Sequence, residues 1–183
     1  MTNSAEAVFT QHYDSPLGGI LLAADKIGLR GAWFDGQKYF ARDLPENRIE
    51  RETHALAEAR RWLDIYFSGK EPDFLPPLHP VGSAFRQAVW AILLQIPYGQ
   101  TVTYGEIARQ LAGTAGLSRM SAQAVGGAVG HNEISIIIPC HRVVGTNGSL
   151  TGYAGGIDRK VQLLELERAD MTGFFVPKKG TAL

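Results

Sequence analysis

The sequence predicts an α+β protein in which a small antiparallel sheet with one helix precedes a mostly helical domain containing a helix-turn-helix unit. Three observations lead to this prediction. Short apolar stretches alternate with turn residues near the start of the chain, as in a β meander. Four prolines within residues 72–80 are incompatible with a regular helix and separate the chain into halves. Apolar residues then recur at helical spacing in successive segments of the second half.

The first elements are predicted to be strands followed by a helix. Turn-forming residues separate three apolar stretches, which are expected to be strands at residues 8–13, 20–24 and 29–34. From Ile49 to Phe67, apolar side chains recur at helical intervals with arginines and glutamates between them. We therefore expect one helix over this range, ending at Ser68-Gly69-Lys70.

The proline-rich segment is interpreted as a linker, and the charge balance changes at the same place. Residues 1–84 hold 9 Lys/Arg against 12 Asp/Glu, whereas residues 85–183 hold 9 against 6. Only the second half is therefore suited to attract phosphates, and weakly. The predicted division is a first domain, a second domain and a surface tail, at residues 1–80, 81–171 and 172–183.

The second domain is predicted to begin with helices, at residues 83–96, 103–111 and 121–129. Thr103 and Glu106 form a capping-box pattern, in which each side chain bonds the other residue's amide at a helix start. A Gly- and Ser-rich link, residues 113–118, joins the last two helices. Two short helices joined in this way indicate a helix-turn-helix unit.

The third of these helices contains the pair Gly126-Gly127, and each glycine costs about 1 kcal/mol relative to alanine. Two explanations remain open at this point. Either another helix packs closely against it, or its backbone approaches an outside surface such as a DNA groove.

The remaining elements are predicted around the only cysteine. Ile134 to Ile138 is expected to be a buried strand that Pro139 terminates, so that Cys140 lies at its end. Residues 145–149 have hairpin-turn character. Asp158 is expected to cap a last helix that runs through Val161, Leu164 and Glu167.

Composition limits the classes of protein and site. With one cysteine, the chain has no internal disulfide and no zinc site built on several thiolates. The five histidines show no short metal-ligand spacing, so we expect no metal. No apolar run approaches the roughly 18 residues of a membrane span, and no export signal is visible. An unpaired thiol then indicates the reducing cytoplasm.

Cys140 is followed directly by a base and a cation, in Pro139-Cys140-His141-Arg142. A neighbouring imidazole or guanidinium favours the thiolate, so this run predicts an activated nucleophile. The alternative is that Cys140 is a small buried apolar residue. Adjacent side chains in an extended chain point to opposite faces, so either His141 acts through one water or the backbone bends after Pro139. Glu165 and Glu167 are both candidates to orient the histidine.

The run Pro139 to Val144 resembles the active-site signature of the methylated-DNA–protein-cysteine methyltransferases. Asn132 before it and Gly152-Tyr153-Ala154-Gly155-Gly156 after it belong to the same likeness. The resemblance extends from about Phe85 to Glu167 and is weaker in the first 80 residues, where it rests mainly on the turn Ser15-Pro16-Leu17-Gly18.

The resemblance implies a fold, a substrate and a reaction. The first domain would be ribonuclease H-like, and the second a winged-helix or helix-turn-helix domain that carries the active-site cysteine. The chain would flip O6-methylguanine out of double-stranded DNA and transfer the methyl group irreversibly to Cys140, once per molecule and without a cofactor. O4-methylthymine is a second candidate lesion. The protein would be a monomer in solution, and several copies could line up along DNA.

The resemblance also assigns roles to residues. Cys140 would accept the methyl group with His141 as its water-linked base, and the other catalytic residues would be Glu167, Asn132 and Tyr104. The flipped base would be bound by Tyr153, Ala154, Val143 and Lys160. DNA would be bound by Gln123, Arg119, Ser121, Ala124, Gly127 and Arg142.

One position departs from the family's pattern. The family has an arginine just before the Ala-Val-Gly of the recognition helix, where it fills the gap left by the flipped base. This chain has Gln123 there, with Arg119 four residues earlier. Glutamine lacks the charge and the planar stacking of a guanidinium. Either Gln123 fills the gap less forcefully or Arg119 reaches into it.

Two other classes of function remain as alternatives. A protein that binds alkylated bases without reacting would not need Cys140. A cysteine hydrolase would turn over repeatedly and would need an oxyanion hole, which the sequence does not reveal.

Overall fold

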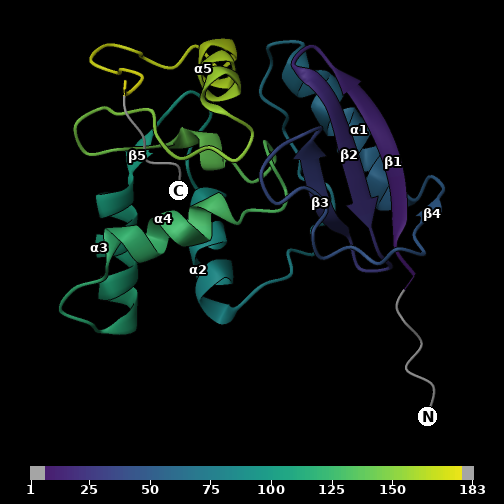
Figure 1. Cartoon of the computed structure of the whole chain (residues 1–183), viewed down its shortest axis with the longest axis horizontal. Helices are drawn as coiled ribbons and strands as arrows, with labels where there is room; N and C mark the ends of the chain where they lie inside the picture. Colours follow the sequence, from purple (N-terminus) through teal and green to yellow (C-terminus); the bar gives the residue numbers. More distant parts are fainter. Residues whose placement is uncertain (1–6, 179–183) are drawn as a thin grey trace. The chain divides into compact units, whose positions relative to one another are not determined.

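The computed structural model describes residues 7–178, and the chain divides into two compact units, Met1–Val81 and Gly82–Leu183. Figure 1 shows a sheet with one helix in the first unit and a mostly helical second unit. The predicted α+β class is confirmed. Among the described residues, no helix is long and apolar enough to cross a membrane.

The first unit is built on a four-stranded sheet in the order β3-β2-β1-β4. Its antiparallel strands are β1 (Phe9–Ser15), β2 (Gly18–Ala24) and β3 (Leu29–Phe34), close to the predicted positions. The tight turn between β1 and β2 needs Gly18, whose φ is +113°. The hydroxyl of Ser15 closes the turn by donating to the Gly18 carbonyl at 2.6 Å.

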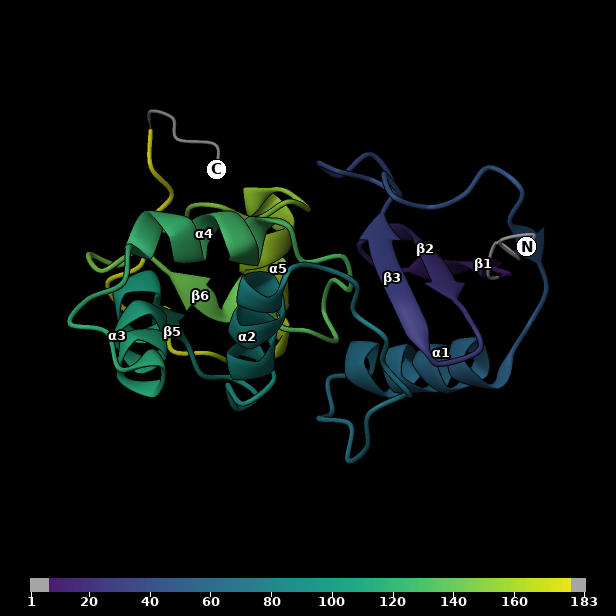
Figure 2. The ribbon, with the colours of Figure 1, turned by 90° about the horizontal axis from the view of Figure 1, so that it is seen from below.

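The helix predicted from Ile49 begins later than expected. β4 (Ile49–Glu50) instead pairs in parallel with the start of β1. Helix α1 (His54–Phe67) begins after Thr53, whose hydroxyl accepts a hydrogen bond from the amide of Leu56. The predicted helix start at Ile49 is therefore wrong, because the helix begins only where a capping side chain, that of Thr53, is available. Figure 2 shows α1 beneath the sheet, and its buried side chains include Leu56 and Leu63.

The proline-rich segment is held against the first unit. The amide of Leu29 donates to the Pro77 carbonyl at 2.7 Å, and the amide of His79 donates to the Leu29 carbonyl at 2.8 Å. The buried carboxylate of Asp25 accepts a 2.7 Å hydrogen bond from His79 Nδ1. A Cβ at Gly28 would lie 2.6 Å from the Pro77 oxygen, so this close approach requires glycine.

Three helices form the first part of the second unit: α2 (Ala84–Leu93), α3 (Tyr104–Ala115) and α4 (Ala122–Gly130). The capping box of Thr103 and Glu106 starts α3 as predicted. Helix α3 continues through half of the expected link and ends at Gly116, whose φ is +67°. Helix α4 lies across α2 and α3 (Figure 2), and the Trp90 indole of α2 donates to the Ala128 carbonyl of α4 at 2.9 Å.

The segment before Cys140 differs from its prediction. Residues 134–138 form buried turns instead of a strand, and Ile136 has a φ of +71°. A continuous apolar run indicates burial without fixing the backbone conformation. A one-turn 3₁₀ helix follows at Cys140–Arg142, and β6 (Val143–Val144) then pairs in parallel with β5 (Val102–Thr103).

Helix α5 (Ile157–Leu166) begins after Gly156, and Asp158 lies in its first turn, so the predicted cap at Asp158 is wrong. Part of the predicted tail is tied down. Phe175 exchanges backbone hydrogen bonds with the segment Gly148 to Leu150, and Phe174 packs against Val144, Leu150 and Leu164. Residues 179–183 of the predicted tail lie outside the described residues.

Candidate active site

Cys140 is presented by a turn that the side chain of Asn132 holds together. Its amide nitrogen Nδ2 donates to the carbonyls of Ile138 at 2.8 Å and Ile134 at 3.3 Å, and to the sulfur of Cys140 at 3.1 Å. Its oxygen accepts from the amide of Ile134 at 3.0 Å. This buried side chain therefore connects the C-terminal end of α4 to the cysteine.

The thiol of Cys140 is shielded, with the residue 4% exposed. Burial raises the pKa of Cys140, against the hydrogen bond from Asn132 and the positive charge of Lys160, which lower it. In the free protein the cysteine is therefore a thiol. The predicted activation by Arg142 is corrected, because its charge is directed at Glu167, and His141 stays the candidate base.

A buried hydrogen-bonded pair, His141 and Glu167, lies beside the cysteine. His141 Nε2 is 2.6 Å from Glu167 Oε1, and both side chains are fully buried. Of the two glutamates considered above, the structure selects Glu167, because Glu165 is exposed. An Nε2–H that donates to the carboxylate leaves the lone pair of a neutral imidazole on Nδ1. Burial lowers the pKa of His141, so the ring is neutral near pH 7.

Arg142 lies in a different place from the DNA surface to which it was assigned. Its guanidinium donates two 2.9 Å hydrogen bonds to the carboxylate of Glu167 and one of 2.7 Å to the carbonyl of Ile96. Only 7% of the residue is exposed. Its sequence position beside the nucleophile gave no indication that the side chain turns inward to an ion pair.

Lys160 is also inside the protein, with 0% exposure. Its ammonium group donates to the carbonyls of Val143 at 2.5 Å and Thr151 at 2.7 Å. It therefore connects the strand after the active-site turn to the loop before α5. Burial lowers the pKa of Lys160 from 10.5 to about 8.

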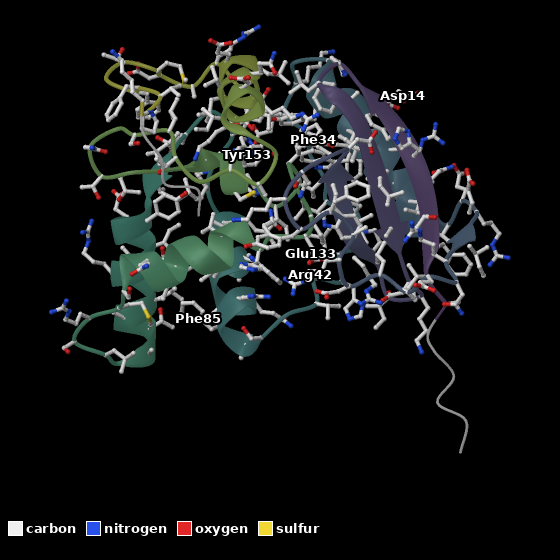
Figure 3. The ribbon with its side chains drawn as sticks, viewed as in Figure 1. Asp14, Phe34, Arg42, Phe85, Glu133 and Tyr153 are labelled. Atoms are coloured by element: carbon white, nitrogen blue, oxygen red, sulfur yellow. The ribbon has the colours of Figure 1, made fainter. Side chains whose placement is uncertain are left out.

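Two tyrosines face the same region. The hydroxyl of Tyr104, from the first turn of α3, donates to the Thr151 carbonyl at 3.2 Å. The ring of Tyr153 meets the ring of His141 edge to face at 6.4 Å between centroids. Figure 3 shows Tyr153 between α4 and α5 in the view of Figure 1. Burial raises the pKa of both phenols, and the nearby cysteine raises it further, so both hydroxyls keep their protons.

Three contributors to this site were missed in the sequence. The Gly99 amide donates to Glu167 Oε2 at 3.1 Å, and the Ile96 and Thr151 carbonyls accept from Arg142 and Lys160. Backbone groups leave almost no signal in a sequence. Gly99 is the exception: its φ is +74°, and a Cβ there would lie 2.8 Å from the Glu167 carbonyl oxygen.

The predicted DNA-binding residues of α4 are at the surface. Ser121 caps the helix, and the exposed residues at its start and in the preceding link include Ser121, Gln123, Ala124 and Arg119. Gly127 is partly exposed, and a Cβ built on it meets nothing within 4 Å. Close packing inside the protein therefore does not account for Gly127.

Two family models together match most of the chain. The 6-O-methylguanine DNA methyltransferase ribonuclease-like domain matches residues 8–80, and the DNA binding domain of the same family matches residues 84–169. This chain belongs to that family. Among the described residues, no group of three His, Cys, Asp or Glu side chains is placed to hold a metal ion.

Curated relatives and solved structures agree with this assignment. Methylated-DNA–protein-cysteine methyltransferases of Methanosarcina acetivorans and Mycobacterium leprae are 45% and 46% identical, over 85% of this chain and 95% and 89% of theirs. The crystal structure of Mycobacterium tuberculosis OGT in complex with DNA has a TM-score of 0.74 and 42% identity, covering 88% of this chain and 94% of that one.

Proposed function

We propose that this protein repairs double-stranded DNA by moving the methyl group of O6-methylguanine to its own Cys140, once per molecule. The observation that carries the proposal is a cysteine held by Asn132 beside a buried His141–Glu167 pair, in the unit matched by the family's DNA binding domain. A cofactor is not needed, because the acceptor is part of the chain.

The reaction balances with the groups at hand. The thiol proton leaves Cys140 for the Nδ1 side of His141 through a water, and Glu167 stabilises the imidazolium that results. The sulfur then attacks the methyl carbon, so that the S–C bond forms as the O6–C bond breaks. The electron pair of that bond stays on the guanine, which takes up one proton to become ordinary guanine. Loss of one thiol proton balances this uptake.

Substrate binding is assigned to groups around the cysteine. Tyr104 and Tyr153 are protonated donors near the sulfur, suited to hydrogen-bond a guanine edge or its leaving oxygen. Ala154 is partly exposed at the start of the Ala-Gly-Gly turn, where its amide can face the base. The carbonyl of Val143 already accepts from Lys160, so we assign Lys160 to shaping this wall of the pocket, in place of direct contact with the base.

DNA binding is assigned to α4 and the link before it. Flipping a base costs a few kcal/mol, and a side chain that fills the vacated space offsets part of this cost. Gln123 and Arg119 are the candidates, since both are exposed there. Ser121, Ala124 and Gly127 offer a small-residue surface to which a groove can come close. Contacts to phosphates are expected to dominate, so binding should depend little on sequence.

The decisive experiment weighs the intact protein after mixing with excess duplex that contains O6-methylguanine. We expect a gain of one methyl group per molecule, located in the Cys140 peptide. Cys140→Ser is the matched control and should bind without gaining mass. Binding by the natural protein with no mass change would favour a lesion-binding protein. Repeated turnover of an ester or peptide would favour a hydrolase.

The remaining parts of the proposal concern the range of lesions accepted, the oligomeric state of the protein and its cellular compartment. O4-methylthymine is a second substrate to test in the same assay. We propose that the reaction belongs to a second domain, residues 81–171, and that the protein is a cytoplasmic monomer that can cluster on DNA. Sedimentation with and without a long duplex tests the last point.

A further inference from the structure

The carboxylate of Glu167 is bound by His141, Arg142 and the amide of Gly99. Oε1 faces His141 Nε2 at 2.6 Å and accepts from Arg142 Nη2 at 2.9 Å. Oε2 accepts from Arg142 Nε at 2.9 Å and from the Gly99 amide at 3.1 Å. The two-pronged contact with Arg142 fixes the plane of the carboxylate, and with it the direction in which Oε1 meets the histidine.

Arg142 is itself fixed on its remaining sides. Its third nitrogen, Nη1, donates to the Ile96 carbonyl at 2.7 Å, and its guanidinium lies over the Tyr98 ring at 5.7 Å. The turn Pro97-Tyr98-Gly99 therefore encloses the ion pair. A guanidinium with all of these partners is not available to a phosphate.

The charges around His141 determine where a proton resides. Burial alone raises the pKa of Glu167, but the hydrogen bonds and charges of His141 and Arg142 hold it well below the ordinary range. Burial lowers the pKa of His141; Glu167 raises it, and the charges of Arg142 and Lys160 lower it further. Without Arg142, the buried Glu167 anion would keep the Gly99 amide and His141 but would lose the cation bound to it, and the simplest way to neutralise the anion is to protonate the histidine.

We infer that Arg142 is a positioning residue for methyl transfer: it balances the charge of Glu167, so that His141 stays neutral and able to take the thiol proton. The inference rests on the proposed function and deepens it. Arg142 touches neither the substrate nor the sulfur in this assignment, and acts through Glu167.

The other titratable groups near this pair come from three directions. His141 faces Glu167 from the 3₁₀ turn, the Tyr153 ring packs on the histidine from the loop before α5, and Lys160 acts on both His141 and Cys140 from α5. Tyr98 lies on the far side of the guanidinium. Among these described groups, Arg142 is the cation in direct contact with the carboxylate. Its removal should therefore have the largest effect on the protonation of His141.

The test is the rate of single-turnover methyl transfer to Cys140 from about pH 5 to 9, measured for the natural protein and for Arg142→Met. The natural protein should lose rate only below the ordinary histidine pKa of 6.5. In Arg142→Met the loss should begin at least one pH unit higher, giving a reaction at least about threefold slower at pH 7 that recovers in alkali. Arg142→Lys keeps the charge and should return the profile close to its natural position, with a lower plateau.

A control and a second readout separate this role from a structural one. Arg60→Met removes an exposed arginine of the first unit, paired with Glu52, and should leave the profile unchanged. The ¹⁵N shifts of the His141 ring should show a charged ring at neutral pH in Arg142→Met and a neutral ring in the natural protein. An unshifted profile with a neutral ring in the variant would overturn the inference.

A double substitution keeps the inference testable if Arg142→Met alone does not fold. If Arg142→Met does not fold but the pair Arg142→Met/Glu167→Gln does, the unbalanced charge of Glu167 is the cause, as the inference requires. If neither folds, Arg142 is a structural residue and the inference is wrong. A natural protein that transfers no methyl group would refute the proposed function, whereas a reactive natural protein with an unshifted variant refutes only the role of Arg142.

Discussion

The side-chain amide of Asn132 donates to the sulfur of Cys140 at 3.1 Å while also holding two backbone carbonyls of the turn between them. One side chain thus determines both the shape of the active-site turn and the environment of the nucleophile. Because its hydrogen bond stabilises the sulfur anion, the contact becomes stronger as the thiol loses its proton.

Replacing Asn132 should therefore damage stability and reactivity together. Asn132→Ala leaves the buried amide of Ile134 without its side-chain acceptor, at a cost of about 1–3 kcal/mol, and removes one of two donors from the Ile134 and Ile138 carbonyls. We expect a lower midpoint of urea unfolding and a slower methyl transfer. Asn147→Ala, in an exposed turn, is the control for loss of an asparagine amide and should change neither by a comparable amount. Equal effects of the two substitutions would contradict the role assigned to Asn132.

Lys160 should make the protein more stable as the solution becomes alkaline. Its pKa is about 8 in the folded state and 10.5 ordinarily, so between these values the unfolded chain binds more protons. Stability then rises with pH across this window, since the free energy of unfolding follows the difference in bound protons. Urea unfolding from pH 7 to 9, below the range in which the unfolded tyrosines ionise, should show this rise for the natural protein relative to Lys160→Met. A variant that keeps the full slope would show that another group is responsible.

Gly127 should respond to substitution in opposite directions with and without DNA. A Cβ at this helical position meets no atom of the protein, so Gly127→Ala should stabilise the free protein by about 1 kcal/mol. If DNA comes close to this backbone, the same methyl group should weaken binding. Gly113→Ala in α3 also adds a Cβ into open space and should stabilise without affecting DNA affinity. Unchanged DNA affinity in Gly127→Ala would exclude a close approach here.

Substitutions of Gln123 test which side chain fills the space that the flipped base leaves in the duplex. Gln123→Arg should tighten binding to lesion-containing duplex and increase the slope of log affinity against log salt by about one unit. Gln110→Arg on α3 adds the same charge elsewhere and is the control. Gln123→Ala and Arg119→Ala should then be compared in the transfer assay. The larger fall in rate identifies the residue that enters the duplex, and no fall in either would exclude both.

The elements that were predicted well are those with local signals. The capping box of Thr103 and Glu106 contains its own start signal, and the alternating strands of the first unit are bounded by turn residues such as Gly18. The run Ile134–Ile138 was predicted as a strand and is a buried turn. Burial was correct there, but the backbone conformation depends on Asn132, which bonds across the turn from outside the run.

The site was predicted less completely, for a related reason. Cys140, His141 and Glu167 could be named from a motif and helical spacing, but the orientation of Arg142 could not. Its direction is set by the Ile96 carbonyl, the Gly99 turn and the Tyr98 ring, which lie more than forty residues away in the chain. The placement of Lys160 depends in the same way on two backbone carbonyls, so a charged residue that usually faces solvent is fully buried.

The shielding of the Cys140 sulfur also decides which competing reagents can consume it. Peroxides, disulfides and soluble electrophiles attack exposed thiolates, whereas Cys140 is a buried residue, 4% exposed, whose sulfur carries its proton. The unreacted protein should therefore keep its thiol for long periods in the presence of such oxidants and electrophiles. Because each molecule accepts only one methyl group, this protection preserves the thiol for the DNA lesion.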